Sequence, residues 1–188
     1  MSLESFFYAI TVVFLAELGD KTMLATIFLS AQYKRPGVVL LAAMGALTAA
    51  TVIAVITGMI FAVTLPIDMI LYFSGALFII MGVYTMAISR KNEDVESVTP
   101  TTFGGMFSLV FLAELGDKTQ IAVLALAAQS EAPIIIFLGA ILGFLLVNSL
   151  GAVAGDRIAE HAPIIWIKRV TGLVFIGFGI LILFRGNI

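Results

Sequence analysis

Long apolar runs alternate with short polar breaks along the whole chain. An apolar run of about 20 residues is long enough to cross the hydrocarbon core of a bilayer as a helix. Six runs reach this length, at about 5–31, 37–64, 67–89, 103–129, 134–158 and 164–184. The breaks between them carry proline, glycine or charged residues, which tend to end helices. The pattern therefore predicts an all-α integral membrane protein with six transmembrane helices.

The composition supports a membrane protein and narrows the chemistry. Hydrophobic residues make up 61% of the chain and charged residues 12%, whereas about a quarter of the residues in a soluble domain are charged. The absence of cysteine excludes disulfides, thiolate metal sites and a cysteine nucleophile. The ten basic residues form no patch suited to nucleic acid. The lipid bilayer is therefore an expected partner, nucleic acid is not, and the oligomeric state stays open.

The chain is a tandem duplication. When it is shifted by 97 residues without a gap, 27 of the 91 aligned positions are identical, and the nine residues F-L-A-E-L-G-D-K-T at Phe14–Thr22 recur at Phe111–Thr119. Because three spans are an odd number, the second copy has to enter the membrane from the opposite side. Many secondary transporters have such inverted repeats, which rock around a substrate site near the midplane. The sequence predicts a first three-helix repeat at 1–91, a cytoplasmic linker at 92–101 and a second, inverted three-helix repeat at 102–188.

Basic residues between the spans predict the orientation, because loops rich in Lys and Arg stay in the cytoplasm. The first, third and fifth loops carry Lys34, Arg35, Arg90, Lys91, Arg157, Lys168 and Arg169, whereas the termini and the other two loops carry only Arg185. Both termini are therefore expected outside the cytoplasm. The first residues lack a basic segment and a small-residue cleavage site, so they are expected to begin the first span rather than a removed signal peptide.

Each copy of the nine-residue motif places charged groups in the middle of an apolar run. The six groups are Glu17, Asp20, Lys21, Glu114, Asp117 and Lys118. At about 2.5–3.5 kcal/mol for each charge at the bilayer centre, they would cost roughly 18 kcal/mol without compensation. On a continuous helix Glu17, Asp20 and Lys21 project to one side, and inverted symmetry would bring them toward their counterparts. Four carboxylates and two ammonium groups leave a charge of −2, which suits one divalent cation.

Oxygen is the main ligand atom that this cluster offers. A carboxylate-rich site without cysteine or a central histidine favours Ca²⁺, Mg²⁺ or Mn²⁺ over zinc or copper. Gly19 and Gly116 separate the two acids of each copy, where glycine permits close approach or local unwinding of a helix. A buried carboxylate beside an ammonium group can hold either a metal ion or a proton. Lys21 and Lys118 are expected to neutralise the glutamate of their own copy when no ion is bound.

Four residues directly after these charged groups are expected to support the metal site. Thr22 and Thr119 add hydroxyl groups, and the copies then differ, with Met23 in the first and Gln120 in the second. The Met23 thioether would favour Mn²⁺ over the harder Ca²⁺ as a ligand, although methionine in an apolar helix usually serves packing. Asn148, in the middle of the fifth span, is able to offer an oxygen ligand or an interhelical hydrogen bond.

A purely structural interpretation of the motif is a pair of buried Glu–Lys bridges that fix the register of the helices. Such bridges account for one carboxylate on each helix. They do not account for the second carboxylate, which both copies contain. The residues therefore favour ion transport over a purely structural role.

The duplicated E-x-G-D-[KR]-[ST] signature on six spans resembles that of the cation–proton antiporter family of MneA-type bacterial manganese exporters and eukaryotic Golgi manganese/calcium transporters. The match covers the entire chain, and both copies are complete as E-L-G-D-K-T. The resemblance implies export of Mn²⁺, with Ca²⁺ as a second candidate, in exchange for protons. It implies a cation site formed by Glu17, Asp20, Glu114 and Asp117, with Lys21, Thr22, Lys118 and Thr119 as supporting positions. Eukaryotic members typically carry additional N-terminal sequence, so the bacterial inner membrane, with periplasmic termini, is the expected location.

Three other functions stay open at this point. An exporter of organic solutes, such as amino acids, would need apolar pocket walls and unpaired charges for the amino and carboxylate groups. An intramembrane aspartyl protease would use two aspartates in a G-x-G-D context, and Asp20 and Asp117 fit this only in part, because glutamate replaces the first glycine. A passive cation channel would show no dependence on a proton gradient. An enzyme and a resident cofactor are not expected.

Overall fold

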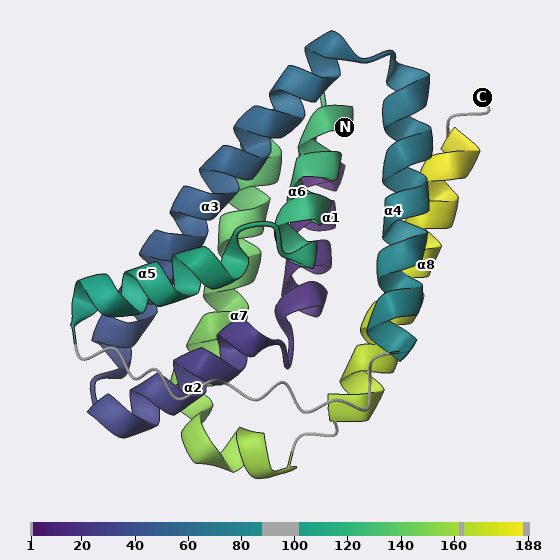
Figure 1. Ribbon diagram of the computed structural model, residues 1–188. Helices are drawn as coiled ribbons and strands as arrows, with labels where there is room; N and C mark the ends of the chain where they lie inside the picture. The colour runs from purple at the N-terminus through teal and green to yellow at the C-terminus, as the bar shows by residue number, and fades with distance from the viewer. Residues whose placement is uncertain (1, 88–101, 162–163, 186–188) are drawn as a thin grey trace.

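Helices are the only regular secondary structure in the residues that the computed structural model describes, 2–87, 102–161 and 164–185 (Figure 1). The helices are α1 (Ser2–Glu17), α2 (Lys21–Tyr33), α3 (Pro36–Thr64), α4 (Ile67–Ala87), α5 (Phe103–Glu114), α6 (Lys118–Gln129), α7 (Pro133–His161) and α8 (Ile164–Arg185). The expected all-α class is confirmed. The predicted linker at 92–101 lies outside the described residues.

The first and fourth predicted spans are not continuous helices, so this part of the prediction is wrong. The run at 5–31 is divided into α1 and α2, and the run at 103–129 into α5 and α6. The reason is local: Gly19 has φ 73° and Gly116 has φ 77°, which lies in the left-handed region that a right-handed helix cannot contain. Figure 1 shows the resulting bends, with α2 and α5 running sideways away from the upright α1 and α6. Local unwinding, one of the two possibilities raised for these glycines, is what the structure shows.

Three described helices are long and apolar enough to cross a membrane by themselves, and the chain is a multi-pass membrane protein. They are Pro36–Thr64, Ile67–Ala87 and Pro133–Ala152, and the shorter apolar helices are Lys21–Ser30, Phe103–Glu114 and Arg169–Phe184. Large apolar side chains such as Val63, Phe73, Leu112 and Phe184 are exposed, which suits contact with lipid. The count of six spans stays a prediction, because two of them would each consist of two half-helices.

The two halves of the sequence interlock. Helix α1 packs against α7 of the second half, and α5 packs against α3 of the first. Helix α2 likewise lies along α7, and α6 lies along α3. The main apolar core accordingly mixes residues of both halves, for example Leu47, Val123 and Phe144. These paired contacts are those that two units related by a twofold axis would make, while the opposite membrane orientation of the units stays a prediction.

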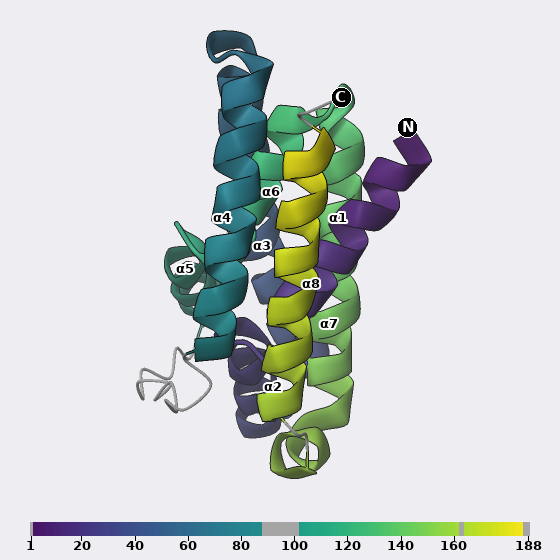
Figure 2. The same cartoon turned by 90° about the vertical axis from the view of Figure 1, so that its right-hand side faces the viewer.

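Helices α4 and α8 form a close antiparallel pair beside this core (Figure 2). Four glycines line the contact, with Gly82 against Gly172 and Gly75 against Gly179. A Cβ atom at Gly82 would lie 2.6 Å from the carbonyl oxygen of Gly172, and one at Gly179 would lie 2.6 Å from the carbonyl oxygen of Gly75. Small residues of this kind let helix backbones approach closely in a membrane. The glycines therefore set the distance between α4 and α8.

We expect Gly82→Ala to lower the free energy of unfolding by about 1–3 kcal/mol, the usual effect of overpacking a tight contact. The added methyl group would meet backbone atoms of α8, which cannot move aside alone. Gly177→Ala is the matched control, because it lies in the same helix pair and a Cβ there would meet no described atom within 4 Å. Thermal unfolding of the purified protein in detergent measures both. Equal stability of the two variants would contradict the proposed role of the close contact.

Candidate metal centre

Two helix breaks face one another in the interior and carry the acidic residues of the motif. Glu17 ends α1 and Glu114 ends α5, and both side chains are fully buried. Asp20 and Asp117 occupy the N-cap positions of α2 and α6. The two turns have the same backbone bond, from Asp20 N to the Glu17 carbonyl (3.0 Å) and from Asp117 N to the Glu114 carbonyl (3.1 Å). Each motif thus folds as a helix end, a Leu-Gly turn and a helix start.

Side chains complete the backbone hydrogen bonding at the first break. In a continuous helix the Gly19 amide would donate to the Leu15 carbonyl. Here the Leu15 carbonyl accepts a hydrogen bond from the Thr171 hydroxyl of α8 (2.9 Å), and the Gly19 amide donates to the Met23 sulfur (3.3 Å). The Leu15 carbonyl and the Gly19 amide, which would bond to each other in a continuous helix, therefore both have other hydrogen-bond partners. The Met23 thioether, one of the expected supporting groups, contacts the turn backbone in this structure.

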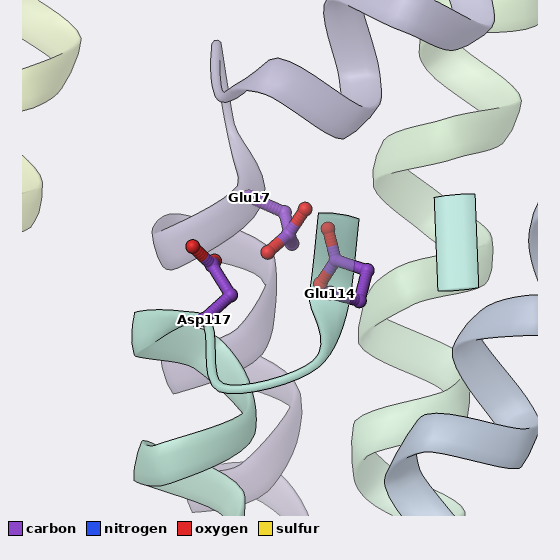
Figure 3. Close-up of side chains that lie close together, drawn as sticks. All are labelled: Glu17, Glu114 and Asp117. Atoms are coloured by element: carbon purple, nitrogen blue, oxygen red, sulfur yellow. The ribbon is translucent and has the colours of Figure 1, made fainter. Parts of the chain in front are cut away.

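Three carboxylates lie within reach of a single ion. One ligand oxygen from each of Glu17, Glu114 and Asp117 lies within 4.8 Å of the others, and Figure 3 shows the three groups around one space. Oxygens that bind one Ca²⁺ at 2.3–2.6 Å are at most about 5 Å apart, so the spacing suits a divalent cation. The expected fourth member, Asp20, does not belong to this group among the described residues.

Each acid also has one buried oxygen that lacks a hydrogen-bond partner among the described residues. These atoms are Oε2 of Glu17, Oδ2 of Asp20, Oε2 of Glu114 and Oδ2 of Asp117. Removing a carboxylate oxygen from water without replacing its bonds is costly, by about 1–3 kcal/mol or more for a charged group. A cation, protons or ordered water would satisfy these oxygens. The arrangement is therefore suited to binding positive charge.

The threonines of the motif hold the glutamates of the opposite half. The Thr22 hydroxyl donates to Oε1 of Glu114, and the Thr119 hydroxyl donates to Oε1 of Glu17 at 2.5 Å. Each bond fixes one oxygen of the glutamate, and the other oxygen has no partner in the ranges that the structure describes. Each threonine thus orients a carboxylate across the interface, while the supporting role expected for both at a metal site stays a prediction.

The lysines pair with aspartates of the opposite half, which corrects the expected pairing with glutamate. Lys21 Nζ lies 2.8 Å from Oδ1 of Asp117, and Lys118 Nζ lies 2.6 Å from Oδ1 of Asp20. The expectation assumed a continuous helix, in which Lys21 follows Glu17 by one turn. Because the helix is interrupted at Gly19, Glu17 lies at the end of α1 and Lys21 at the start of α2. The ammonium groups consequently neutralise the aspartates.

The two halves of the centre differ in exposure. The Asp20 side chain is 7% exposed and that of Asp117 is 15% exposed, while their lysine partners are 21% and 32% exposed, respectively. Leu115, in the second turn, is exposed, whereas its counterpart Leu18 is only partly exposed. The bridge between Lys21 and Asp117 is therefore the more exposed of the two, and the turn between α5 and α6 is the more exposed turn.

Two further polar residues near the motif, Gln120 and Asn148, differ in their hydrogen bonding. The amide of Gln120 is buried, and neither its oxygen nor its nitrogen has a partner among the described residues. The Asn148 oxygen accepts a hydrogen bond from Thr26 (2.9 Å), and its nitrogen donates to the Phe144 carbonyl (3.0 Å). Of the two roles considered for Asn148, the structure therefore shows the interhelical hydrogen bond. Thr26 was missed in the sequence, although it follows Thr22 by one helical turn.

Several known proteins are similar in sequence to this chain. The family profile described as "Divalent cation/proton antiporter GDT1" matches residues 5–93 and 102–187. A Vibrio cholerae protein named "Putative manganese exporter" is 32% identical over 169 residues, which are 89% of this chain and 84% of that protein. A GDT1-like protein of Synechocystis is 32% identical over 200 residues, covering 95% of this chain and 96% of its own length. Divalent cation/proton antiporter GDT1 of Saccharomyces cerevisiae is 24% identical over 241 residues, covering 97% and 84% of the two chains. No solved structure gives a significant match.

Proposed function

Because the chain belongs to the GDT1 family of divalent cation/proton antiporters, we propose that it exports Mn²⁺ from the cytoplasm in exchange for protons. The family is one of transporters, so the chain is not an enzyme, and divalent cations and protons are its transported species. The observation that carries the proposal is the group of Glu17, Glu114 and Asp117, each with a buried oxygen that has no hydrogen-bond partner within the described part of the chain.

Manganese is the proposed cargo, with Ca²⁺ as the second candidate. Both ions accept carboxylate oxygen, and selectivity between hard cations depends on cavity size and ligand number. The name of the Vibrio cholerae relative supports manganese for that protein. The Met23 sulfur lies at the turn next to the site, where a small movement would bring a softer ligand to the ion. Gln120 and its buried amide oxygen are a further proposed ligand.

In the proposed mechanism, the cation and protons occupy the same carboxylates in turn, and the site opens to one side of the membrane at a time. Protons on the carboxylates leave when the cation enters, and they return from the opposite side when the cation is released. Thr22 and Thr119 keep one oxygen of each glutamate in place during both states. The bridges between lysine and aspartate hold the two half-helix starts together. Rocking of two inverted three-helix units would then expose the site to one side at a time.

The alternatives are weaker on specific grounds. The aspartyl-protease hypothesis is set aside because the family consists of transporters, and Asp20 and Asp117 each bind a lysine of the other half. The organic-solute exporter is disfavoured because the polar groups at the centre are acids already arranged around one point. We propose the bacterial inner membrane as the location, with both termini in the periplasm.

Transport in proteoliposomes tests the proposal. With an acidic lumen, Mn²⁺ entry is expected to accelerate while the lumen becomes more alkaline, because each entering cation drives protons out. Protein-free liposomes, and liposomes whose gradient is collapsed by a proton ionophore, are the controls. Mn²⁺ movement that ignores the proton gradient would indicate a channel. Movement of Ca²⁺ alone would overturn the choice of cargo, and movement of neither ion would overturn the function.

A further inference from the structure

One face of α2 carries buried hydroxyl groups that continue away from the metal centre. Thr22, Thr26 and Ser30 follow one another at intervals of four residues, which places them on the same side of the helix. All three are buried, Ser30 being only 5% exposed. They lead from the carboxylates toward the end of α2 at Tyr33, beside the break that carries Lys34.

The three hydroxyl groups on this face differ in their hydrogen bonding. Thr22 donates to Glu114, and Thr26 donates to Asn148 of the neighbouring helix α7. The Ser30 hydroxyl is buried and has no hydrogen-bond partner among the described residues. A buried hydroxyl without a partner costs about 1–3 kcal/mol, and ordered water is the usual way to satisfy it. The face therefore offers hydroxyl oxygens to which water molecules can hydrogen-bond, with Ser30 open for such a bond.

The second half lacks this face. The residues of α6 that correspond to Thr22, Thr26 and Ser30 are Thr119, Val123 and Ala127. The counterpart of Asn148 is Thr51, whose hydroxyl donates to the Leu47 carbonyl within its own helix (2.7 Å). Packing alone does not require hydroxyl groups at these places, since the apolar residues of α6 fill the equivalent ones. The difference points to a function that only one side of the centre has.

We propose that the hydroxyl face of α2, with Asn148, is the route by which protons pass between Glu114 and the solvent at the Lys34 end. This inference rests on the proposed proton exchange. A proton leaves the Glu114 carboxyl group for the Thr22 oxygen, Thr22 releases its own proton to the next oxygen or water, and a proton reaches solvent beyond Ser30. Glu114 is then a carboxylate that accepts the hydrogen bond from the Thr22 hydroxyl. The reverse sequence reloads it.

The chemistry of the face suits protons better than the cation. Hydroxyl groups donate and accept at once, so they can pass a proton along a chain of hydrogen bonds. A divalent ion would need several oxygen ligands at every step, and this face offers one or two side-chain oxygens for each turn of helix. The cation is therefore expected to enter elsewhere, and the turn between α5 and α6 is the more exposed side of the centre.

Ser30→Ala is the sharpest test, because the Ser30 hydroxyl makes no bond to the described protein whose loss would weaken the fold. In full-length protein in proteoliposomes, we expect proton-coupled Mn²⁺ transport to slow by about a hundredfold, the low end of what a proton-transfer group contributes. The ratio of rates in H₂O and D₂O is expected to rise, since proton movement becomes limiting. Affinity for Mn²⁺, measured by titration calorimetry in detergent, is expected to stay unchanged.

Thr26 supplies a second variant and its controls. Thr26→Val reproduces the residue of the second half and should slow transport in the same way, whereas Thr26→Ser keeps a hydroxyl and should keep the rate. Thr51→Val is the matched control, because it removes an equally buried hydroxyl outside this face. Wild-type rates and isotope ratios in Ser30→Ala and Thr26→Val would overturn the inference but leave the antiporter intact. If the unaltered protein shows no proton coupling, the proposed function fails, and the inference fails with it.

Discussion

Glu114→Gln is expected to lower the affinity for Mn²⁺ by about two to three orders of magnitude and to abolish proton-coupled transport. The substitution keeps the shape of the side chain and an oxygen for the Thr22 hydroxyl, but it removes one negative charge from the carboxylate group. At an effective dielectric constant of 20, a unit charge about 4 Å away contributes roughly 4 kcal/mol for each unit of charge on its partner. A divalent ion would lose at least this much interaction energy, part of which the amide oxygen replaces.

Titration calorimetry and proteoliposome flux measure this effect, and unfolding in detergent shows whether the variant still folds. Glu131→Gln is the matched control, because Glu131 is an exposed residue between α6 and α7. Glu17→Gln and Asp117→Asn are expected to behave like Glu114→Gln, since all three acids belong to the same group. Wild-type affinity in Glu114→Gln, with the protein folded, would remove this group as the cation site.

Lys118→Ala is expected to destabilise the protein by about 3–5 kcal/mol, the usual consequence of leaving one member of a buried ion pair without its partner. The group left behind is Asp20, which lies 2.6 Å from the Lys118 ammonium and is almost completely buried. Lys21→Ala should have a smaller effect on stability, because the Lys21–Asp117 pair is more exposed and water screens such pairs.

A double variant tests whether the bridge between Lys118 and Asp20 stabilises the protein by neutralising the charge of Asp20. Asp20→Asn combined with Lys118→Gln removes both charges, so it is expected to recover most of the stability that Lys118→Ala loses. Chemical unfolding in detergent measures the three proteins under the same conditions. A double variant no more stable than Lys118→Ala would show that the bridge does not stabilise by neutralising Asp20. Transport by the double variant tells whether the charges of the bridge are also needed for exchange.

The sequence was a reliable guide to the larger features and to the identity of the charged residues. The apolar runs predicted helices throughout, and the gap-free repeat singled out four acids, three of which the structure places in one group. The comparisons confirm the family that the duplicated motif indicated. These features depend on residue type and on spacing along the chain, which a sequence records directly.

The geometry of the centre was harder to predict, because it depends on two backbone conformations. Treating the motif as helical placed Lys21 over Glu17, whereas the left-handed Gly19 separates them into different helices. The order of residues contained a usable signal, since glycine after a helix and aspartate before the next are common end and start residues. The pairing of Lys21 with Asp117 could not be predicted from this signal, because it depends on how two distant turns meet.

The bonds between the two halves of the chain also determine the smallest assembly that could form this centre. A single three-helix unit would contain a lysine, a threonine, a glutamate and an aspartate, yet none of them would have the partner that it has here. Two such units in contact supply every partner at once. A protein with only one copy of the motif would therefore need to assemble as a dimer, of identical or of related chains, to build the same centre. In the present chain the duplication provides that dimer within one polypeptide.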